Sequence, residues 1–201
     1  EFQNRSRLLI YPLILFVMAE TIIQVALPEL HVTWLCVTLL SVLYFIYCSE
    51  MWNQLDALTG LLNQNSYLKQ TGGVRCKGGV LVVFDVDDFK QINDRYGHIQ
   101  GDLCLAGIAE CIKKSYANFG YCYRIGGDEF CVLLKNGGNE GRCKQEFLQR
   151  LQEKRGEIAF LPTVSYGSAP FSGEDIVKVK DRADQDMYQY KKERKNRKRL
   201  S

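Results

Sequence analysis

Acidic side chains gather at two places in this sequence where packing gives no reason for them. Asp85 ends the all-apolar run 80–84, and Asp128 and Glu129 follow the glycine pair at 126–127. If the strands that carry these residues are neighbours, the carboxylates converge. Clustered carboxylates repel one another, and a bound divalent cation such as Mg²⁺ removes that repulsion. The spacing therefore favours a metal site built from two separate segments.

The neighbouring residue types fit the chemistry of phosphate groups. Gly126 and Gly127 have no side chains, so a phosphate can approach the backbone closely. Lys90 follows Asp85 within the same segment and can neutralise phosphate charge. Together these residues are the types that metal-assisted phosphoryl or nucleotidyl transfer requires. The residues alone leave an alternative open, because aspartate-rich turns often only cap helices and glycine pairs often only form hairpins.

The elements that must position these residues alternate between strands and helices. The apolar, β-branched run 80–84 predicts a buried central strand, and residues 161–169 predict another. The runs 120–124 and 129–134 flank the glycine pair, which predicts a tight hairpin. Helices are predicted over residues 63–68, 89–96, 102–116, 146–155 and 175–195. Because the hairpin interrupts a pure βαβ pattern, we expect an α/β sandwich with a mixed central sheet.

The first 48 residues differ from the rest of the chain in being mostly apolar. Their charged side chains are few, namely Glu1, Arg5, Arg7, Glu20 and Glu29. The runs 8–27 and 30–48 are each long enough to cross a hydrocarbon core as a helix. We therefore expect two transmembrane helices within residues 1–50 and a separate domain over residues 51–201.

The orientation of this predicted hairpin follows from basic residues. Arg5 and Arg7 precede the first run and a domain rich in basic residues follows the second, so the positive-inside rule predicts that both ends face the cytoplasm. Two alternatives stay open: the pair packs against other membrane helices with Glu20 facing a protein neighbour, or it forms a buried soluble hairpin. Because the sequence does not begin with Met, the pair is also a candidate for the end of a longer membrane region.

The eight cysteines carry no functional pattern. None forms a C-x-x-C pair, and none has zinc-finger spacing with a histidine. Several lie inside apolar runs, as Cys131 does. We expect buried free thiols in a reducing compartment.

Five ordered motifs between Asp56 and Asn196 resemble those of the GGDEF family of nucleotidyl cyclases. Residues 84–102 read FDVDDFKQINDRYGHIQGD, similar to the family signature D-x-D-x-F-K-x-x-N-D-x-x-G-H-x-x-G-D, and residues 123–130 read YRIGGDEF. Three further segments of this sequence resemble motifs of the family. They are DALTGLLN at 56–63, VSYGSA at 164–169, and ADQDMY at 183–188, which is followed by Lys191. The resemblance implies a palm-type nucleotidyl-cyclase fold and a diguanylate cyclase, which joins two GTP molecules into cyclic di-GMP.

The resemblance also implies roles for single residues. Mg²⁺ or Mn²⁺ would be held by Asp85, the carbonyl of Val86, Asp128 and Glu129. Asp128 or Glu129 would help to deprotonate the attacking 3′-hydroxyl group, with Lys90 as a further catalytic residue. The residues that would bind the triphosphate are Phe89, Lys90, Gly126, Gly127, Lys191 and Lys195.

Guanine specificity is assigned by the resemblance to Asn93 and Asp102. A carboxylate accepts hydrogen bonds from N1–H and N2–H₂ of guanine, a pairing that adenine does not offer. Because an unpaired buried acceptor costs about 1–3 kcal/mol, the resemblance implies GTP rather than ATP. It also implies a homodimer, since each domain holds half of a catalytic site. We expect no nucleic-acid partner.

The sequence departs from the family at three places. The R-x-x-D of the family's inhibitory site is replaced by residues 117–120, so we expect no product inhibition through Ala117 and Gly120. The family's N-R becomes Asn63-Gln64, and its G-R-N becomes Arg194-Lys195-Asn196, which puts one phosphate contact in doubt. These changes favour the alternative, a catalytically weak domain that acts as a GTP-binding or dimerisation module in signalling. For either function we expect the bacterial inner membrane, with the GGDEF domain in the cytoplasm.

Overall fold

The computed structural model describes residues 15, 18–19, 21–26, 33–52, 54–72, 78–135 and 137–200. The chain divides into two compact units, Glu1–Trp52 and Asn53–Ser201. The candidate site belongs to the second unit.

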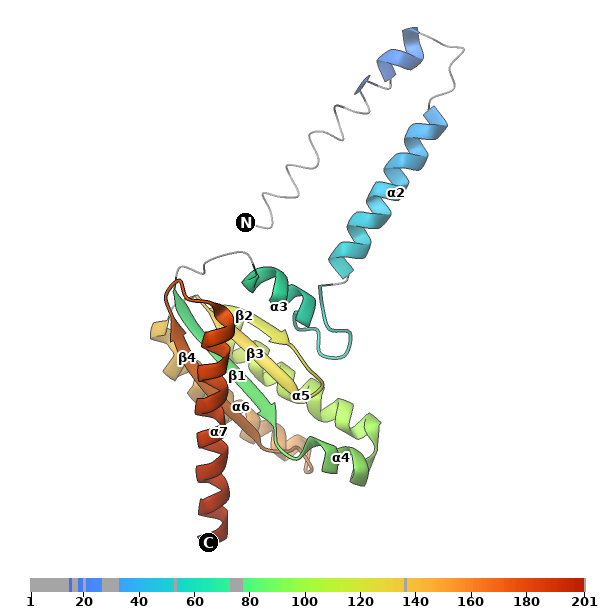
Figure 1. Ribbon diagram of the computed structural model, residues 1–201. Helices are drawn as coiled ribbons and strands as arrows, with labels where there is room; N and C mark the ends of the chain where they lie inside the picture. Colours follow the sequence, from blue (N-terminus) through green and yellow to red (C-terminus); the bar gives the residue numbers. More distant parts are fainter. Residues whose placement is uncertain are drawn as a thin grey trace. The chain divides into compact units, whose positions relative to one another are not determined.

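The second unit is built on a four-stranded sheet (Figure 1). Its strands are β1 (Gly79–Val86), β2 (Gly120–Arg124), β3 (Glu129–Leu134) and β4 (Val164–Phe171), in the order β2-β3-β1-β4. All three strand pairs are antiparallel, so the prediction of a mixed sheet is wrong. The physical reason is the hairpin: it reverses the chain, and β3 enters the sheet between β2 and β1 rather than β2 pairing with β1 directly. The result is the split βαβ arrangement of ferredoxin-like folds.

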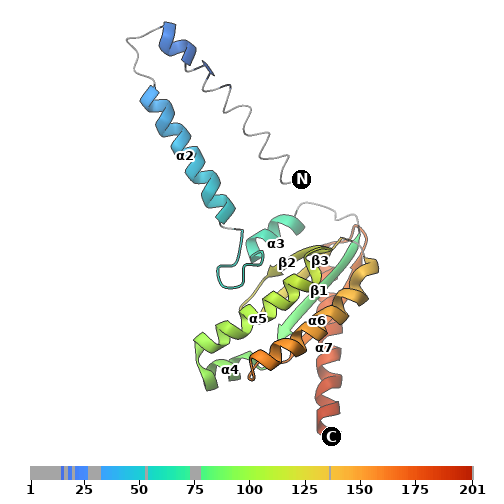
Figure 2. The ribbon, with the colours of Figure 1, turned by 180° about the vertical axis from the view of Figure 1, so that it is seen from behind.

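In the described part of the second unit, five helices pack around this sheet. They are α3 (Gln64–Thr71), α4 (Phe89–Tyr96), α5 (His98–Tyr116), α6 (Glu140–Glu157) and α7 (Ile176–Leu200), with one 3-10 turn, η1 (Gly137–Asn139). Helices α5 and α6 cover one face of the sheet and α7 crosses the other, as Figures 1 and 2 show from opposite sides. Every helix and strand predicted for this unit is present, and the largest difference is that α6 begins six residues earlier than predicted.

Strand β1 is the central element of the fold because both of its faces are buried. Val80, Val82 and Phe84 belong to the core under α5 and α6, while Leu81 and Val83 belong to the core under α7. This alternation follows from the period of two in a β-strand. The prediction of a buried central strand is therefore confirmed. The described cysteines of both units are all free thiols, and most of them are buried.

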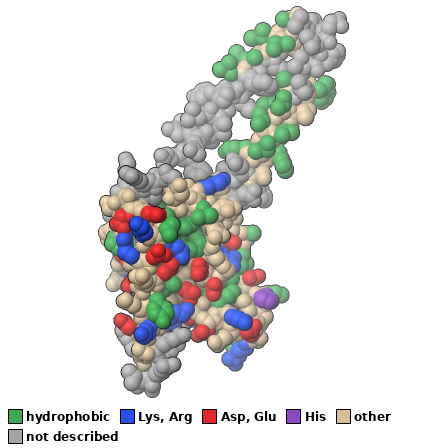
Figure 3. Space-filling view, viewed as in Figure 1, with side chains coloured by type: hydrophobic (Ala, Val, Ile, Leu, Met, Phe, Trp, Pro, Cys, Tyr) green, Lys and Arg blue, Asp and Glu red, His purple; other side chains and the backbone are tan. Residues whose placement is uncertain are grey.

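In the first unit, helix α2 spans Thr33–Trp52, and many of its described side chains are apolar and exposed (Figure 3). Among the described residues, no helix combines the length and the apolar character needed to cross a membrane. The prediction of two transmembrane helices is therefore not supported, and most of run 8–27 lies outside the described residues.

Helix α7 approaches β4 very closely at Gly167. A Cβ atom at this position would lie 2.2 Å from the carbonyl oxygen of Ala183 and 2.2 Å from the backbone nitrogen of Met187. Both contacts are with helix backbone, which cannot rotate away. Only a residue without a side chain therefore permits this packing of the helix on the sheet.

We predict that Gly167→Ala destabilises the domain. Forcing extra volume into a well-packed site costs about 1–3 kcal/mol, so the free energy of unfolding measured in urea should fall by at least that amount. The matched control is Gly156→Ala in α6, where a Cβ atom meets nothing within 4 Å. Replacing glycine by alanine inside a helix should raise stability there by about 0.5–1 kcal/mol. Equal effects of the two substitutions would contradict the close approach of α7.

Candidate functional site

The predicted acidic residues come together at one end of the sheet. In the antiparallel register of β1 and β3, Asp85 lies directly opposite Glu129. The next bond along, from the backbone N–H of Val86 to the carbonyl oxygen of Asp128, measures 3.2 Å. Directly opposed residues of such a pair have Cβ atoms about 5 Å apart on the same face of the sheet. The two acidic segments are thus neighbours, as the sequence predicts.

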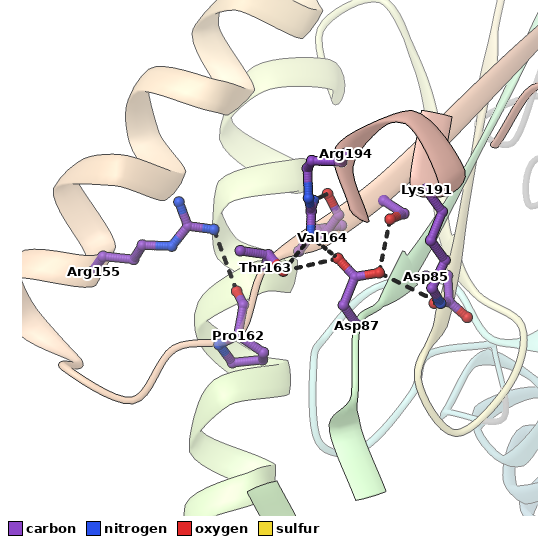
Figure 4. Close-up of polar contacts among 9 residues, drawn as sticks. Asp85, Asp87, Arg155, Pro162, Thr163, Val164, Lys191 and Arg194 are labelled. Atoms are coloured by element: carbon purple, nitrogen blue, oxygen red, sulfur yellow. Dashed lines mark hydrogen bonds and ion pairs between the residues drawn. The ribbon is translucent and has the colours of Figure 1, made fainter. Parts of the chain in front are cut away.

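Asp85 is paired with a cation from the far end of the chain. The Nζ atom of Lys191, on α7, lies 2.6 Å from Asp85 Oδ1 and 3.4 Å from Asp87 Oδ1 (Figure 4). Both Asp85 and Lys191 remain partly exposed. The pairing raises the pKa of Lys191 against the opposing effect of burial, so the side chain stays charged. Lys191 therefore holds a positive charge beside the acidic end of β1.

Asp87 is the most deeply buried carboxylate of the site, with its side chain 5% exposed. Its Oδ1 accepts a hydrogen bond from Ser165 at 2.7 Å, and its Oδ2 accepts one from Thr163 at 2.9 Å and one from Arg194. Burial alone would raise the pKa of Asp87, but these hydrogen bonds and the charge of Arg194 lower it. Asp87 is therefore an ionised group whose partners all come from outside its own strand.

Sequence reasoning did not assign this cluster of Asp87, Thr163, Ser165 and Arg194. Thr163 and Ser165 flank the start of β4 and lie more than seventy positions from Asp87 in the chain. The available signal was the second aspartate of D-x-D, which comes directly after a strand that is buried on both faces.

The glycine turn between β2 and β3 is braced by Arg124. Its Nη2 donates to the carbonyl oxygen of Gly127 at 2.7 Å, and its Nη1 donates to Asp56 Oδ1 at 3.0 Å. The same carboxylate oxygen accepts from the backbone N–H and the hydroxyl of Thr59. Burial would raise the pKa of Asp56, but the bonds from Thr59 and Arg124 lower it. The first motif of the domain thus holds the turn that presents Asp128.

Gly126 and Gly127 are themselves exposed, so the backbone of this turn is open to a ligand. Asn63, the last residue of the first motif, caps α3 by accepting a hydrogen bond from the N–H of Ser66 at 3.0 Å. This cap gives Asn63 a structural role that the motif alone did not specify.

An unpaired polar atom lies between α4 and α5. The side-chain oxygen of Asn93 is buried and accepts no hydrogen bond. A Cβ atom on Gly101 would lie 1.9 Å from this oxygen, so only glycine at position 101 lets the Asn93 side chain pack this closely against α5. Buried polar groups without partners are rare in native structures and often mark a ligand's place. Asp102 follows Gly101 and is exposed, so the two predicted base-reading residues lie at adjoining points of this junction.

For the remaining predicted residues, the structure gives the position in the fold but no side-chain contact that bears on the predicted role. Phe89 is partly buried against the core, and Lys90 is exposed on the first turn of α4. The side chain of Lys195 lies outside the described residues. Ala117 ends α5 and Gly120 begins β2, and the absence of product inhibition there stays a prediction.

The predicted metal ligands fit a hard divalent cation by their chemistry, since Asp85, Val86, Asp128 and Glu129 offer carboxylate and carbonyl oxygens at one end of the sheet. Within the described residues, however, no three acidic, histidine or cysteine side chains are gathered closely enough to form a metal site as they stand. Lys191 instead provides the positive charge next to Asp85.

Comparison with known proteins agrees with this geometry. Residues 53–197 match the family model described as the GGDEF domain of diguanylate cyclases. Diguanylate cyclase DgcS of Shewanella oneidensis is 32% identical over 154 residues, which are 73% of this chain and 52% of that protein. The probable diguanylate cyclase DgcJ of Escherichia coli is 30% identical over 151 residues, or 71% of this chain and 30% of the relative. The chain thus spans about half the length, or less, of these relatives.

Solved structures show the same fold. The GGDEF domain of DgcB from Caulobacter crescentus in complex with c-di-GMP is 27% identical, with a TM-score of 0.54, over 69% of this chain and 90% of that one. Diguanylate cyclase SiaD from Pseudomonas aeruginosa, in complex with its activator SiaC, has a TM-score of 0.61 over 96% of this chain and 78% of its own. At 22% identity, the likeness to SiaD concerns the fold alone.

Asp56→Asn tests the brace on the glycine turn. At pH 7 we expect the free energy of unfolding to fall by about 1.5–3 kcal/mol, because hydrogen bonds to a charged group contribute about that much. The folded-state pKa of Asp56 lies below its ordinary value. Its contribution is therefore full above the ordinary pKa of about 3.9 and is lost as the pH falls through the folded-state pKa. Urea unfolding should show the difference between the two proteins shrinking below about pH 4.

The matched control is Asp181→Asn, which removes an exposed carboxylate of α7. A loss of stability at pH 7 as large in this control as in Asp56→Asn would contradict the brace.

Proposed function

This chain belongs to the GGDEF family of diguanylate cyclases, and we propose that it condenses two GTP molecules into cyclic di-GMP and two pyrophosphates. The observation that supports this activity best is the pairing of Asp85 with Glu129 across β1 and β3, beside the exposed glycine turn and Lys191. Acidic groups, an open backbone and a cation at one end of a sheet are what a triphosphate and its attacking hydroxyl group require.

The acidic residues have two tasks in this reaction. Asp85, the carbonyl of Val86, Asp128 and Glu129 would hold a divalent cation, Mg²⁺ or Mn²⁺, which supplies charge neutralisation at the triphosphate when bound. Asp128 or Glu129 accepts the proton of the 3′-hydroxyl group as it attacks. Each attack forms one bond from the 3′-oxygen to the α-phosphorus of the other GTP and breaks the bond to its pyrophosphate.

The triphosphate is bound by backbone and cationic groups. The exposed turn at Gly126 and Gly127 carries no side chain, so the triphosphate oxygens can approach its backbone without steric hindrance. Lys191, together with Lys90 and Lys195, neutralises its charge, while Phe89 forms part of the floor of the site. As Lys191 binds phosphate, it leaves Asp85 to the cation, so the ion pair between the two side chains is exchanged for two new pairs.

Guanine recognition is assigned to Asn93 and Asp102. The buried, unpaired oxygen of Asn93 is an acceptor for a donor on the guanine edge, and Gly101 lets the Asn93 side chain lie close against α5, next to Asp102. Asp102 accepts a second bond from the same edge. Adenine carries an acceptor where guanine carries its N1–H donor, so ATP would leave these acceptors unpaired at a cost of about 1–3 kcal/mol.

Each chain supplies the residues for one GTP, so the reaction needs two copies whose sites face one another. The homodimer is accordingly part of the proposal. An alternative is favoured by the departures from the family motifs at Gln64 and Arg194. In that alternative the domain binds GTP or dimerises as a signalling module and turns GTP over weakly.

A substitution at Asp128 separates the two functions. We expect the wild-type chain with Mg²⁺ to form cyclic di-GMP from GTP but no cyclic product from ATP, measured by chromatography. Asp128→Asn should lower product formation by about a hundredfold or more, because a positioned proton acceptor contributes at least that much. Binding of a fluorescent GTP analogue should be retained, since Asn93 and Asp102 are unchanged. Wild-type protein that binds GTP yet forms no product would favour the signalling module.

The proposed location is the bacterial inner membrane, with the GGDEF domain in the cytoplasm. What supports it is the exposed apolar surface of α2, on which Leu43, Phe45 and Ile46 are at least half exposed. Burying such a surface is favourable at about 25 cal/mol per Å². We expect the expressed chain to sediment with the membrane fraction and to be released by detergent but not by high salt. Recovery in the supernatant of a high-speed spin would contradict this location.

A further inference from the structure

Arg194 occupies an unusual place at the end of α7. It stands where the family motif G-R-N has glycine, and its guanidinium group reaches back to the sheet. Its Nη2 donates to Asp87 Oδ2 at 2.5 Å and to the hydroxyl oxygen of Thr163, and its Nη1 donates to the carbonyl oxygen of Val164 at 3.2 Å (Figure 4). One side chain of α7 therefore ties the end of β1 to the start of β4.

The position of Arg194 relates it directly to Lys191. Residues three apart on a helix are neighbours on its surface, so both side chains leave α7 on the same side. Both also meet the acidic end of β1, Lys191 at Asp85 and Arg194 at Asp87. In the part of the chain that the structure describes, these two are the cations paired with Asp87, and Lys191 is the more distant at 3.4 Å.

Charge compensation makes the two cations interdependent. Asp87 is nearly completely buried, and a buried carboxylate needs a counter-charge. Arg194 supplies this counter-charge, and its planar guanidinium group binds the carboxylate of Asp87 and the carbonyl oxygen of Val164 at the same time. Lys191 is then left to Asp85, at 2.6 Å. Without Arg194, the nearest remaining cation for Asp87 is Lys191, which would be drawn away from Asp85.

A second contact holds the same turn of the helix. Tyr190 packs on Tyr166 of β4, with ring centroids 4.5 Å apart. In sequence, Lys191 lies between Tyr190 and Arg194, so contacts to the sheet bracket it on both sides. Because long lysine side chains are otherwise flexible, fixing the backbone on both sides limits where its ammonium group can lie.

We propose that Arg194 is a positioning residue, which by its two-pronged contact to Asp87 and β4 holds Lys191 at the phosphate-binding end of β1. The inference rests on the proposed function only in taking Lys191 as a contact of the GTP triphosphate. Arg194 acts through Lys191 and does not itself touch the nucleotide.

The experiment compares single and double variants of the full chain. Binding of a fluorescent GTP analogue with Mg²⁺ is measured for Arg194→Gln, Lys191→Ala and the double variant, with Lys192→Ala as the matched control. Lys192 is an exposed cation of the same helix turn. Arg194→Gln should weaken GTP binding by about tenfold, as loss of a charge-assisted hydrogen bond does. In the Lys191→Ala background, adding Arg194→Gln should not weaken GTP binding further, because the side chain through which Arg194 acts is already missing.

With Arg194→Gln, either of two results would overturn the inference. Affinity in Arg194→Gln equal to that of Lys192→Ala would show that Arg194 does not influence the nucleotide site. Fully additive losses in the double variant would show that Arg194 acts on the nucleotide independently of Lys191. If Arg194→Gln has no cooperative urea transition, Arg194→Lys replaces it. Lysine keeps the positive charge but lacks the planar guanidinium group that binds two partners, so GTP binding should weaken by about threefold. Wild-type affinity in Arg194→Lys would overturn the inference.

The binding readout keeps this inference separate from the proposed function. A wild-type chain that binds GTP but forms no cyclic di-GMP contradicts the activity, whereas the coupling between Arg194 and Lys191 is still measured. Product formation with unchanged binding in Arg194→Gln contradicts the positioning role and leaves the activity intact.

Discussion

Charge compensation at the end of a buried strand governs the organisation of this domain. Strand β1 is buried on both faces, yet it carries Asp85 near its end and is followed directly by Asp87, and the charge of a buried carboxylate needs a partner. Their partners come from β4 and from α7, the last elements of the chain. The site is complete only when the C-terminal helix lies on the sheet, so the close packing at Gly167 and the chemistry at Asp85 depend on the same docking.

The two sides of the acidic site are supported differently. On the side of the glycine turn, Arg124 links the carbonyl of Gly127 to Asp56 at the start of the domain. On the side of α7, Arg194 links Asp87 to β4. In both places an arginine bridges a carboxylate and a backbone carbonyl. This bidentate role suits the planar guanidinium group, which lysine cannot replace.

Much of this arrangement can be predicted from sequence because it is local. The motif at 126–129 predicts a hairpin, and the apolar run 80–84 predicts a strand that ends at Asp85. The two acidic segments then come together as soon as this strand pairs with the second strand of the hairpin. The sheet direction was mispredicted because alternation of elements does not reveal that β3 enters between β1 and β2. The contact of Arg194 with Asp87 spans 107 positions and has no periodic signal. In the sequence, only the departure from glycine at position 194 marks it, and that departure by itself indicates a weakened phosphate contact.

The split order of the sheet also has a consequence for synthesis of the chain. Strand β1 pairs on one edge with β3, where Val80 meets Leu134, and on the other with β4, where Val80 meets Pro170. During translation the central strand β1 therefore leaves the ribosome before either partner strand has been made. Non-local pairing of this kind slows folding and exposes strand edges to aggregation. The nascent domain therefore has to shelter β1 until residues 164–171 have been made.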